Sequence, residues 1–576
     1  MVQADYDASE HGSLRYAIGI VSVAALGGFL FGFDTAVING AVPVLQHMYL
    51  EQDGFSGGLP VNQLAMKTFT GLAVSLALVG AAVGAFAAGP LADKIGRKSG
   101  MLLAACLFLI SAIGSGLPLT IIDFTVWRFI GGMAFGAASV LAPAYIAEVA
   151  PAKMRGRMGS LQQLAIVIGI FVALMSNLLI VESTTTRSAG DSWLFGFKAW
   201  QWMFWIEAVP AVIYGLLTLR IPESPRYLVA QDRDGEARAV LGSVLGASSV
   251  DRKIAEIRDT ISTEHTPRLS DILSRKRGFL LPIVWIGIGL SVFQQFVGIN
   301  VVFYYSNLLW QSVGFGESRA FLLTFISGGI NVLTTFIAIA SVDKIGRKPL
   351  LMLGSAGMAI SLGTMAWVFS AAPIVTRPAE LTIPEDVRIG SVELRVTVAQ
   401  SGEPASHMLD IDAASAVNGR LVVDFSSVVP DPAKPADLTI EGLPLGYLLS
   451  ASDRADSGTV THRTTVQPSL SGEHQHLGTI ALVALNVFVF CFGFSWGPVV
   501  WVLLGEMFTN QIRGAALAVA AAAQWAANFF ISWTFPLLAG VGLGTAYGFY
   551  AGSAVLSLLF VTVFIRETKG RELEDM

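Results

Sequence analysis

The segment that decides the fold is FQQFVGINVVFYYS, which runs from Phe293 to Ser306 inside an apolar stretch of the chain. An unpaired amide is costly in apolar surroundings, so three amides within one such segment need a reason. On a straight helix, with about 100° between residues, Gln294, Gln295 and Asn300 point in three directions. Gly298 lies between them and permits the helix to unwind, which lets all three amides turn toward one cavity.

The chemistry of these amides indicates the kind of ligand that such a cavity would take. A cluster of uncharged hydrogen-bond donors and acceptors suits a neutral ligand with many hydroxyl groups. The alternative is that the amides only join helices, because Asn and Gln hydrogen-bond across helices in membrane bundles. The segment by itself leaves both interpretations open.

The composition predicts an integral membrane protein. Of the 576 residues, 53% are hydrophobic and only 14% are charged, whereas roughly a quarter of a soluble domain is charged. Apolar runs of roughly 20 residues recur along the chain, and each can cross a hydrocarbon core of about 30 Å. These runs predict an all-α membrane fold with twelve transmembrane helices near 17–44, 70–91, 99–117, 121–146, 160–181, 201–220, 279–309, 320–341, 349–371, 478–503, 515–538 and 543–565.

The basic residues predict the orientation. With the N-terminus in the cytoplasm, most of the 37 Lys and Arg residues fall on inner segments. The short outer connections then carry only Lys67, Arg187, Lys198 and Arg319, as the positive-inside rule requires. We therefore expect a multi-pass protein of the inner (plasma) membrane with both termini in the cytoplasm. The first 14 residues contain no basic region typical of a signal peptide, so no cleavage is expected.

Net charge and cysteine content exclude some functions. A net charge of −5 gives no reason to expect a nucleic acid as a partner. Cys106 and Cys491 both lie inside predicted spans, where we expect them to pack as small apolar residues. We expect no disulfide and no metal site from this pair.

The chain repeats itself. GPLADKIGRK at 89–98 follows the second predicted span, and VDKIGRK at 342–348 follows the eighth. This repeat predicts two pseudo-symmetric six-helix bundles with a site between them near the middle of the membrane. The expected domains are an N-terminal bundle (1–220), a cytoplasmic helical linker (221–278), the first part of a C-terminal bundle (279–371), an insert (372–476), and the remaining bundle with a short tail (477–576).

The insert at 372–476 is predicted to be a small β-rich extracytoplasmic domain between helices nine and ten. SVELRVTV, GRLVVDF and ADLTIEGL alternate or cluster β-forming residues between turn residues. His474 and His476 suggest a metal pair only weakly, and we favour a solvated tail with no metal there. Nothing in the insert resembles a catalytic set, so no enzyme activity is expected.

Several motifs at span ends identify a family. These are DKIGRK (twice), RFIGG at 128–132, PAYIAEVAP at 143–151, PESPRYL at 222–228, QQFVGIN and ETKG at 567–570. Together and in this order they resemble the sugar porter family of the major facilitator superfamily, most closely its bacterial proton-coupled pentose and hexose (xylose-type) symporters. The resemblance covers about 1–371 and 477–576 and implies a secondary transporter that works by alternating access. It implies no cofactor, and we expect a functional monomer in the lipid bilayer.

The resemblance adds side chains to the amide cluster. Positions that match the family's sugar-contacting residues are Gln163, Asn331, Trp501, Gln524 and Trp525, beside Gln294, Gln295 and Asn300, with Phe31 and Tyr304 closing the pocket. Amides around the rim and indole rings against the apolar face would suit a pyranose. The family's pentose porter has a second amide seven positions after Gln163, where this chain has Ile170. The resemblance therefore does not decide between pentose and hexose.

Two charges inside predicted spans indicate ion coupling. Asp34 and Arg128 lie where a lone charge costs several kcal/mol, so we expect them to pair. In the proton-coupled porters that the chain resembles, an aspartate at this place binds the driving proton, whereas facilitators have a neutral residue. Glu207 is a second acid within a span and is expected to tune the first. The alternative is a structural salt bridge without coupling.

The motifs on the cytoplasmic side contain acids beside basic residues. Ion pairs between helix ends are predicted when the inner gate is shut, formed by Asp93, Arg97, Glu148, Arg157 and Glu223 in the first half and by Asp343, Arg347, Glu506 and Arg513 in the second. Such pairs would bias one conformation and break when the cavity opens inward. The alternative, that these residues only set topology, explains the basic residues but not the acids.

The sequence thus predicts proton-coupled uptake of a monosaccharide, with sugar and protons as partners. An uncoupled facilitator would share the pocket but would not need Asp34. A membrane sugar sensor would need a long cytoplasmic signalling tail, and this chain ends at Met576, shortly after the last predicted span.

Overall fold

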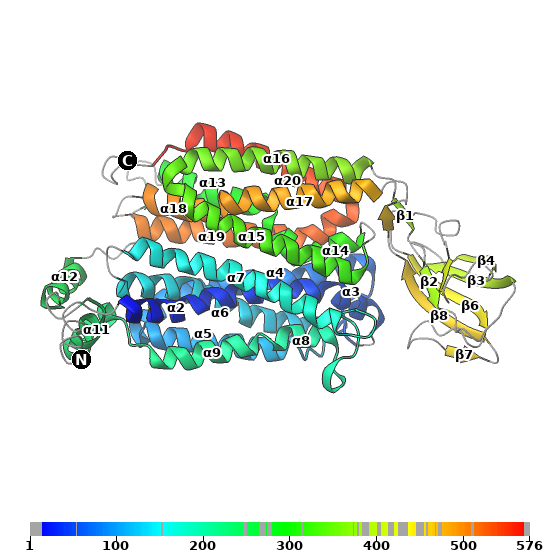
Figure 1. Cartoon of the computed structure of the whole chain (residues 1–576), viewed down its shortest axis with the longest axis horizontal. Coiled ribbons are helices and arrows are strands. Elements are labelled where there is room, and N and C mark those ends of the chain that lie inside the picture. Colours follow the sequence, from blue (N-terminus) through cyan, green and yellow to red (C-terminus); the bar gives the residue numbers. More distant parts are fainter. Residues whose placement is uncertain are drawn as a thin grey trace, which may run out of the picture. The chain divides into compact units, whose positions relative to one another are not determined.

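A computed structural model of the chain (Figure 1) describes most of the bundle and the strands of the insert. The residues described are 14–52, 54–150, 154–245, 250–263, 272–273, 279–312, 315–371, 374–376, 379–382, 391–399, 405–412, 420–423, 436–444, 454–456, 459–466, 468–470, 475–508 and 512–568. The chain divides into two compact units. One unit combines residues 1–307, 317–367 and 483–576, and the other combines 308–316 and 368–482.

The first unit is built from membrane-spanning helices. Among the described residues, twelve segments are long and apolar enough to cross a bilayer, which confirms the predicted number. The first half comprises α2 (Leu14–Val37), η1 (Ile38–Gly40), α3 (Val42–Glu51), α4 (Gln63–Ile95), α5 (Arg97–Ser115), α6 (Ile121–Val149), α7 (Arg155–Glu182), η3 (Leu194–Gly196), α8 (Ala199–Trp205) and α9 (Ala208–Arg220). The second half comprises α13 (Pro282–Phe296), α14 (Ile299–Ser312), α15 (Glu317–Ile345), α16 (Arg347–Ala371), α17 (Gln475–Phe494), α18 (Trp496–Met507), α19 (Arg513–Val541) and α20 (Leu543–Phe564).

Three spans are interrupted near their middle. The seventh breaks between α13 and α14, where Gly298 has a φ of +85°, so the predicted unwinding at this glycine is confirmed. The sixth breaks between α8 and α9 at Glu207, and the tenth breaks between α17 and α18 at Ser495. A proline follows each of these two breaks by three residues, and it lacks the N–H that a continuous helix would use.

Helices of the first half approach one another through small residues. A Cβ added to Gly169 of α7 would collide with the backbone carbonyl of Phe29 on α2. On the other side of the half, a Cβ added to Gly132 of α6 would collide with the carbonyl of Ala77 on α4. Because lipid provides no hydrophobic drive between helices, this close backbone packing is what holds the bundle together.

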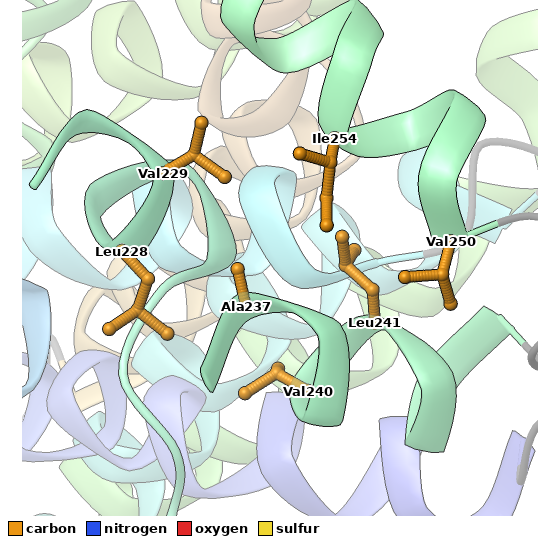
Figure 2. Close-up of a cluster of buried hydrophobic side chains, with 7 residues drawn as sticks. All are labelled: Leu228, Val229, Ala237, Val240, Leu241, Val250 and Ile254. Atoms are coloured by element: carbon orange, nitrogen blue, oxygen red, sulfur yellow. The ribbon is translucent and has the colours of Figure 1, made fainter. Parts of the chain in front are cut away.

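A small cluster of helices follows the sixth span. It consists of α10 (Pro225–Ala230), α11 (Asp234–Leu245) and α12 (Val250–Thr263). Figure 2 shows the apolar side chains that these helices bury against one another, among them Leu228, Leu241 and Ile254. Arg258 pairs with Asp234 at 2.6 Å on the outside of the cluster. The linker therefore has a hydrophobic core of its own.

The insert forms antiparallel strands, as the sequence predicts. The strands are β1 (Ile374–Thr376), β2 (Ala379–Thr382), β3 (Ser391–Ala399), β4 (Ala405–Asp412), β5 (Arg420–Val423), β6 (Ala436–Pro444), β7 (Arg454–Asp456), β8 (Thr459–Val466) and β9 (Pro468–Leu470). Five of them form one sheet in the order β4-β3-β6-β8-β7. The first and last strands, β1 and β9, pair with each other and place Ile374 opposite Leu470, so the insert begins and ends at one point. His474 lies outside the described residues.

Candidate functional site

We call the ends of the spans that carry the two DKIGRK segments the inner ends and the opposite ends the outer ends. The first part of the site is a buried ionic cluster in the first half. Arg128 on α6 donates from Nη1 to Asp34 Oδ1 on α2 at 2.8 Å and from Nη2 to the Asp34 carbonyl oxygen at 3.0 Å. Both side chains are fully buried, as is Glu207 at the break between α8 and α9. The predicted pairing of Asp34 with Arg128 is present.

Glu207 gives this cluster one acid more than it has bases. Its carboxyl group lies close enough to Asp34 for the two acids to share a proton through a hydrogen bond. Among the described residues, both carboxylate oxygens of Glu207 and Oδ2 of Asp34 have no hydrogen-bond donor. Two buried carboxylates facing one guanidinium would leave an uncompensated negative charge, which is expensive in this environment. The cluster is therefore suited to hold one exchangeable proton.

The second part of the site is the amide cluster of the second half. Asn300 Nδ2 donates to Gln295 Oε1 at 2.6 Å, and Gln295 Nε2 donates to Gln294 Oε1 at 3.3 Å. Gln294 Nε2 in turn donates to the Trp496 carbonyl oxygen at 2.8 Å. Unwinding at Gly298 thus brings the three amides together as the sequence predicts. Hydrogen-bonding capacity remains on them for a ligand, because each amide offers two donors and two acceptor lone pairs.

Aromatic rings from both halves meet beside these clusters. Phe31 on α2 stacks on Phe135 of α6 with 5.0 Å between ring centroids. Trp525 on α19 lies 6.1 Å from Phe31 and 6.0 Å from Phe135. Of the residues that sequence matching placed near a sugar, Phe31 and Trp525 are therefore in contact across the two halves.

The remaining predicted sugar residues are placed in different surroundings. Tyr304 and Asn331 are buried, and Tyr304 bonds to Asn528 on α19. Gln163 and Gln524 are half-buried. Trp501 differs from all of them, because its side chain is 42% exposed. Its role in sugar contact stays a prediction.

A buried polar network joins the outer ends of the two halves. Asn39 Nδ2, at the outer end of the first span, donates to the Phe303 carbonyl oxygen and to Ser306 Oγ on α14, each at 2.7 Å. Asn307 donates back to the Asn39 carbonyl oxygen at 3.4 Å, and Thr324 on α15 donates to Asn307 Oδ1 at 3.0 Å. These bonds hold the outer ends of the two halves against each other.

The connection between the fifth and sixth spans adds to this contact. Its Ala189 N–H donates to Glu317 Oε1 at the start of α15 at 2.8 Å, and Ser318 donates to Glu182 at the end of α7. Asp191 stabilises the connection internally. Partial burial works to raise the pKa of Asp191, but hydrogen bonds from Thr186 outweigh this effect and hold the pKa below its usual value. The carboxylate therefore stays ionised and keeps the loop in place.

The charged motifs form two matching clusters at the inner ends. Arg97 pairs with Asp93 and with Glu148, each at 3.1 Å, and its backbone N–H donates to Glu223 Oε1 at 2.9 Å. In the second half, Arg347 binds Glu506 through Nη2 at 2.8 Å and through Nε at 3.1 Å. In the described part of the chain, each of the two clusters is formed by residues of one half only. The side chains of Arg157, Asp343 and Arg513 lie outside the described residues, and the gating role of all nine residues stays a prediction.

Comparison with known proteins identifies the family. The family model described as "Sugar (and other) transporter" matches residues 20–380 and 459–576. The chain is 50% identical over 565 residues to a glucose transport protein of Synechocystis sp., covering 98% of this chain and 97% of that protein. It is 32% identical over 586 residues to a D-xylose-proton symporter of Escherichia coli, covering 97% and 95%. The chain belongs to the sugar porter family of the major facilitator superfamily.

Solved structures of a sugar porter share this fold. The inward open conformation of the xylose transporter XylE from Escherichia coli matches with a TM-score of 0.67 at 30% identity, covering 97% of this chain and 98% of that one. Its partially occluded inward open conformation matches with a TM-score of 0.68 at 30% identity, covering 97% and 99%. As a sugar porter the protein is a multi-pass membrane transporter and not an enzyme. The family match leaves out residues 381–458, so most of the insert is an addition to the sugar porter fold.

Sequence reasoning missed two parts of this sugar porter. Glu567 accepts hydrogen bonds from the Arg347 and Lys348 backbone N–H groups at 3.0 Å, as Glu223 does for Arg97 in the first half. The internal repeat could have predicted it, because PESPR and ETKG each follow the sixth span of a half. Asn39 was the second omission, and no local pattern distinguishes it from a packing residue.

Proposed function

We propose that this sugar porter takes up a monosaccharide together with a proton by alternating access. We place it in the plasma membrane, with both termini in the cytoplasm, and expect it to act as a monomer. The observation that carries the proposal is the buried cluster of Asp34, Arg128 and Glu207. Uncoupled transport does not require two buried acids around one base. A proton symporter, in contrast, needs a group that gains and loses a proton during each cycle.

The proposed sugar pocket is formed mainly by residues of the second half. The linked amides of Gln294, Gln295 and Asn300 would bind sugar hydroxyl groups, and the Phe31 and Trp525 rings would cover an apolar sugar face. The predicted contacts of Gln163, Asn331, Tyr304, Trp501 and Gln524 complete the proposed pocket. The relative with 50% identity is named a glucose transport protein, and the symporter with 32% identity is named for xylose. D-glucose is therefore the first substrate to test and D-xylose the second.

Coupling follows from the charge balance of the cluster. With the outer side open, a proton reaching Asp34 would neutralise it and weaken its bond to Arg128. Loss of this bond would free α2 and α6 to move, so that the outer ends can close around the sugar through Asn39 and its partners. After inward opening, proton release would restore the ion pair. Protonation thus biases one of two states, which is all that coupling requires.

The test is transport by purified protein in liposomes. Uptake of labelled D-glucose, D-xylose and other sugars is measured with and without a pH gradient. We expect Asp34→Asn to retain sugar binding and counterflow but to lose pH-driven accumulation, because Asn keeps the size but cannot exchange a proton. Asp251→Asn, at an exposed position on α12 that belongs to neither the coupling cluster nor the predicted gate, is the control and should accumulate sugar normally.

Accumulation by Asp34→Asn when only a proton gradient is supplied would exclude Asp34 as the coupling site and make Glu207 the next candidate. If sugar flux through the unaltered protein does not change with the pH gradient, the protein is instead a facilitator.

A further inference from the structure

One face of the sixth span, along α9 and the residue before it, carries three buried polar side chains and one alanine in a column that sugar transport does not explain. Glu207, Ala211, Tyr214 and Thr218 follow one another at spacings of four, three and four residues, so they share one face of the helix. All four are buried. The column starts at the acid that faces Asp34 and ends two residues before the exposed Arg220, at the inner end of the span.

The hydroxyl groups of this column lack partners, unlike most hydroxyls in the spans. Several buried threonines donate to the carbonyl four residues before them, as Thr324 does to Ala320 at 2.8 Å and Thr335 does to Asn331 at 2.9 Å, whereas Thr70 on α4 lacks a partner among the described residues, like Thr218. Among the described residues, Thr218 Oγ1 and Tyr214 Oη have no hydrogen-bond partner. A buried hydroxyl without a partner is costly, and the usual partner at such a place is water.

The hydroxyl group of Tyr214 lies directly against the backbone of α2. A Cβ built on Gly27 of α2 would lie 2.9 Å from Oη, closer than real Cβ atoms come, and 3.3 Å from Ala138 Cβ of α6, so a glycine at this place lets the hydroxyl face α2. Gly27 precedes Asp34 by two helical turns, about 10 Å along the axis. Side chains of a helix lean toward its N-terminus, so Tyr214 on α9 leans back toward Glu207 while Asp34 on α2 leans down toward Gly27.

We propose that Tyr214 and Thr218 line the path by which the coupling proton leaves the Asp34 and Glu207 pair for the cytoplasm. Water molecules bridge the hydroxyl groups along this face, where Ala211 contributes only a methyl group. At each hydroxyl, the oxygen accepts the incoming proton and releases its own proton on the other side, so the residue ends neutral. Release of the coupling proton leaves Asp34 as a carboxylate paired with Arg128, and the cluster then carries one more negative charge than with the proton bound.

The charges around this path fit that direction of travel. At its upper end lie Asp34 on α2, Arg128 on α6 and Glu207 directly before α9. At its lower end Lys98 Nζ donates to the Leu219 carbonyl oxygen at 2.8 Å and marks the inner end of α9. In the described part of α2, α5, α6 and α9, no other charged side chain is buried between these ends. The inference rests on proton coupling as the proposed function and adds the route of the proton to it.

The test uses the full chain in liposomes that contain a pH-sensitive dye. D-glucose or D-xylose, whichever gives the larger signal with the unaltered protein, is mixed in by stopped flow, and acidification of the lumen is recorded. We expect Tyr214→Phe to slow acidification about tenfold, less than the hundredfold or more that a positioned proton-transfer group typically contributes, because water can partly replace a hydroxyl. Thr218→Val should slow it several-fold, and sugar counterflow should stay at its normal rate in both variants.

Matched controls make the same chemical changes in the second half. Tyr550→Phe removes a buried hydroxyl that also lacks a partner among the described residues, and Thr364→Val removes one that donates to its own helix. Both should acidify the lumen at the normal rate. The final sugar accumulation should be equal in all four variants, because a path changes the rate of coupling and not its stoichiometry.

Acidification by Tyr214→Phe and Thr218→Val at the control rate would overturn the path. A lower final accumulation in these variants would also overturn it, since they would then act on coupling itself. If the unaltered protein does not acidify the lumen at all, the proposed function fails first, and the variants are not needed to show it.

Discussion

The two halves of the bundle are alike at their inner ends and different at their centres. At the inner ends, Arg97 with Glu148 and Glu223 is repeated by Arg347 with Glu506 and Glu567, down to the carboxylate that accepts two backbone N–H groups. At the centre, the first half has two acids and one base in a fully buried cluster. The second half has three neutral amides at the break of its seventh span.

This difference separates what the fold needs from what the function needs. The inner clusters fix helix ends within each half, and both halves need that support. Protons and sugars make opposite demands at the centre, because a proton site needs ionisable groups whereas a neutral sugar is best bound by uncharged donors and acceptors. We infer that the scaffold was kept in duplicate while the centres were given different chemistry.

The largest effect is expected for a substitution that removes the ion-pair partner of a buried charge at the centre of the first half. Arg128→Ala should lower the free energy of unfolding by about 3 to 5 kcal/mol, because it leaves Asp34 buried and unpaired. Arg347→Ala is the control from the second half, and it should lose less than Arg128→Ala, since the side chain of Glu506 is 32% exposed and water can hydrate its carboxylate. Thermal unfolding in detergent measures both. The double variant of Arg128→Ala with Asp34→Asn should recover part of the loss, and equal losses for the two arginines would contradict the comparison.

An intermediate effect is expected on sugar affinity. Gln295→Ala should weaken sugar binding by about 1 to 3 kcal/mol, because a sugar hydroxyl loses its buried partner. Gln294→Ala should lower stability as well, since this amide also holds the Trp496 carbonyl oxygen. Calorimetric titration should compare the sugar affinity of these two variants with that of Asp34→Asn. Only the two second-half variants should bind sugar less tightly than the unaltered protein. An unchanged affinity for Gln295→Ala would remove that residue from the site.

The smallest effect is expected from the insert, which has no counterpart in the first half. Residues 116–120, GLPLT, connect α5 to α6 in the first half, whereas the insert lies between the corresponding helices α16 and α17. Replacing residues 376–474 by GLPLT should change the free energy of unfolding by less than about 1 kcal/mol, because loop closure depends weakly on length. Transport should remain measurable in liposomes. A correctly inserted variant without any transport would show that the insert takes part in gating.

The sequence by itself determined the spans, the break at Gly298 and the pairing of Asp34 with Arg128. Each of these follows from a local or strongly penalised property: apolar length, a glycine among β-branched residues, or a charge that cannot stay alone in a membrane. The repeat of DKIGRK likewise determined the two halves, because it is legible in the chain without any contact being known.

Only the tertiary structure decided which groups remain without partners and which join the halves. In the sequence Asn39 is one polar residue among others at a span end, and only the structure shows that it bonds to α14. The sequence likewise gives Tyr214 no special role, and only the structure shows that its hydroxyl lies against Gly27 without a hydrogen-bond partner among the described residues. Trp501, expected to contact sugar, is 42% exposed in this arrangement. Hydropathy and spacing specify which face of a helix is polar, but the partner on that face comes from a distant helix, and packing alone determines which one.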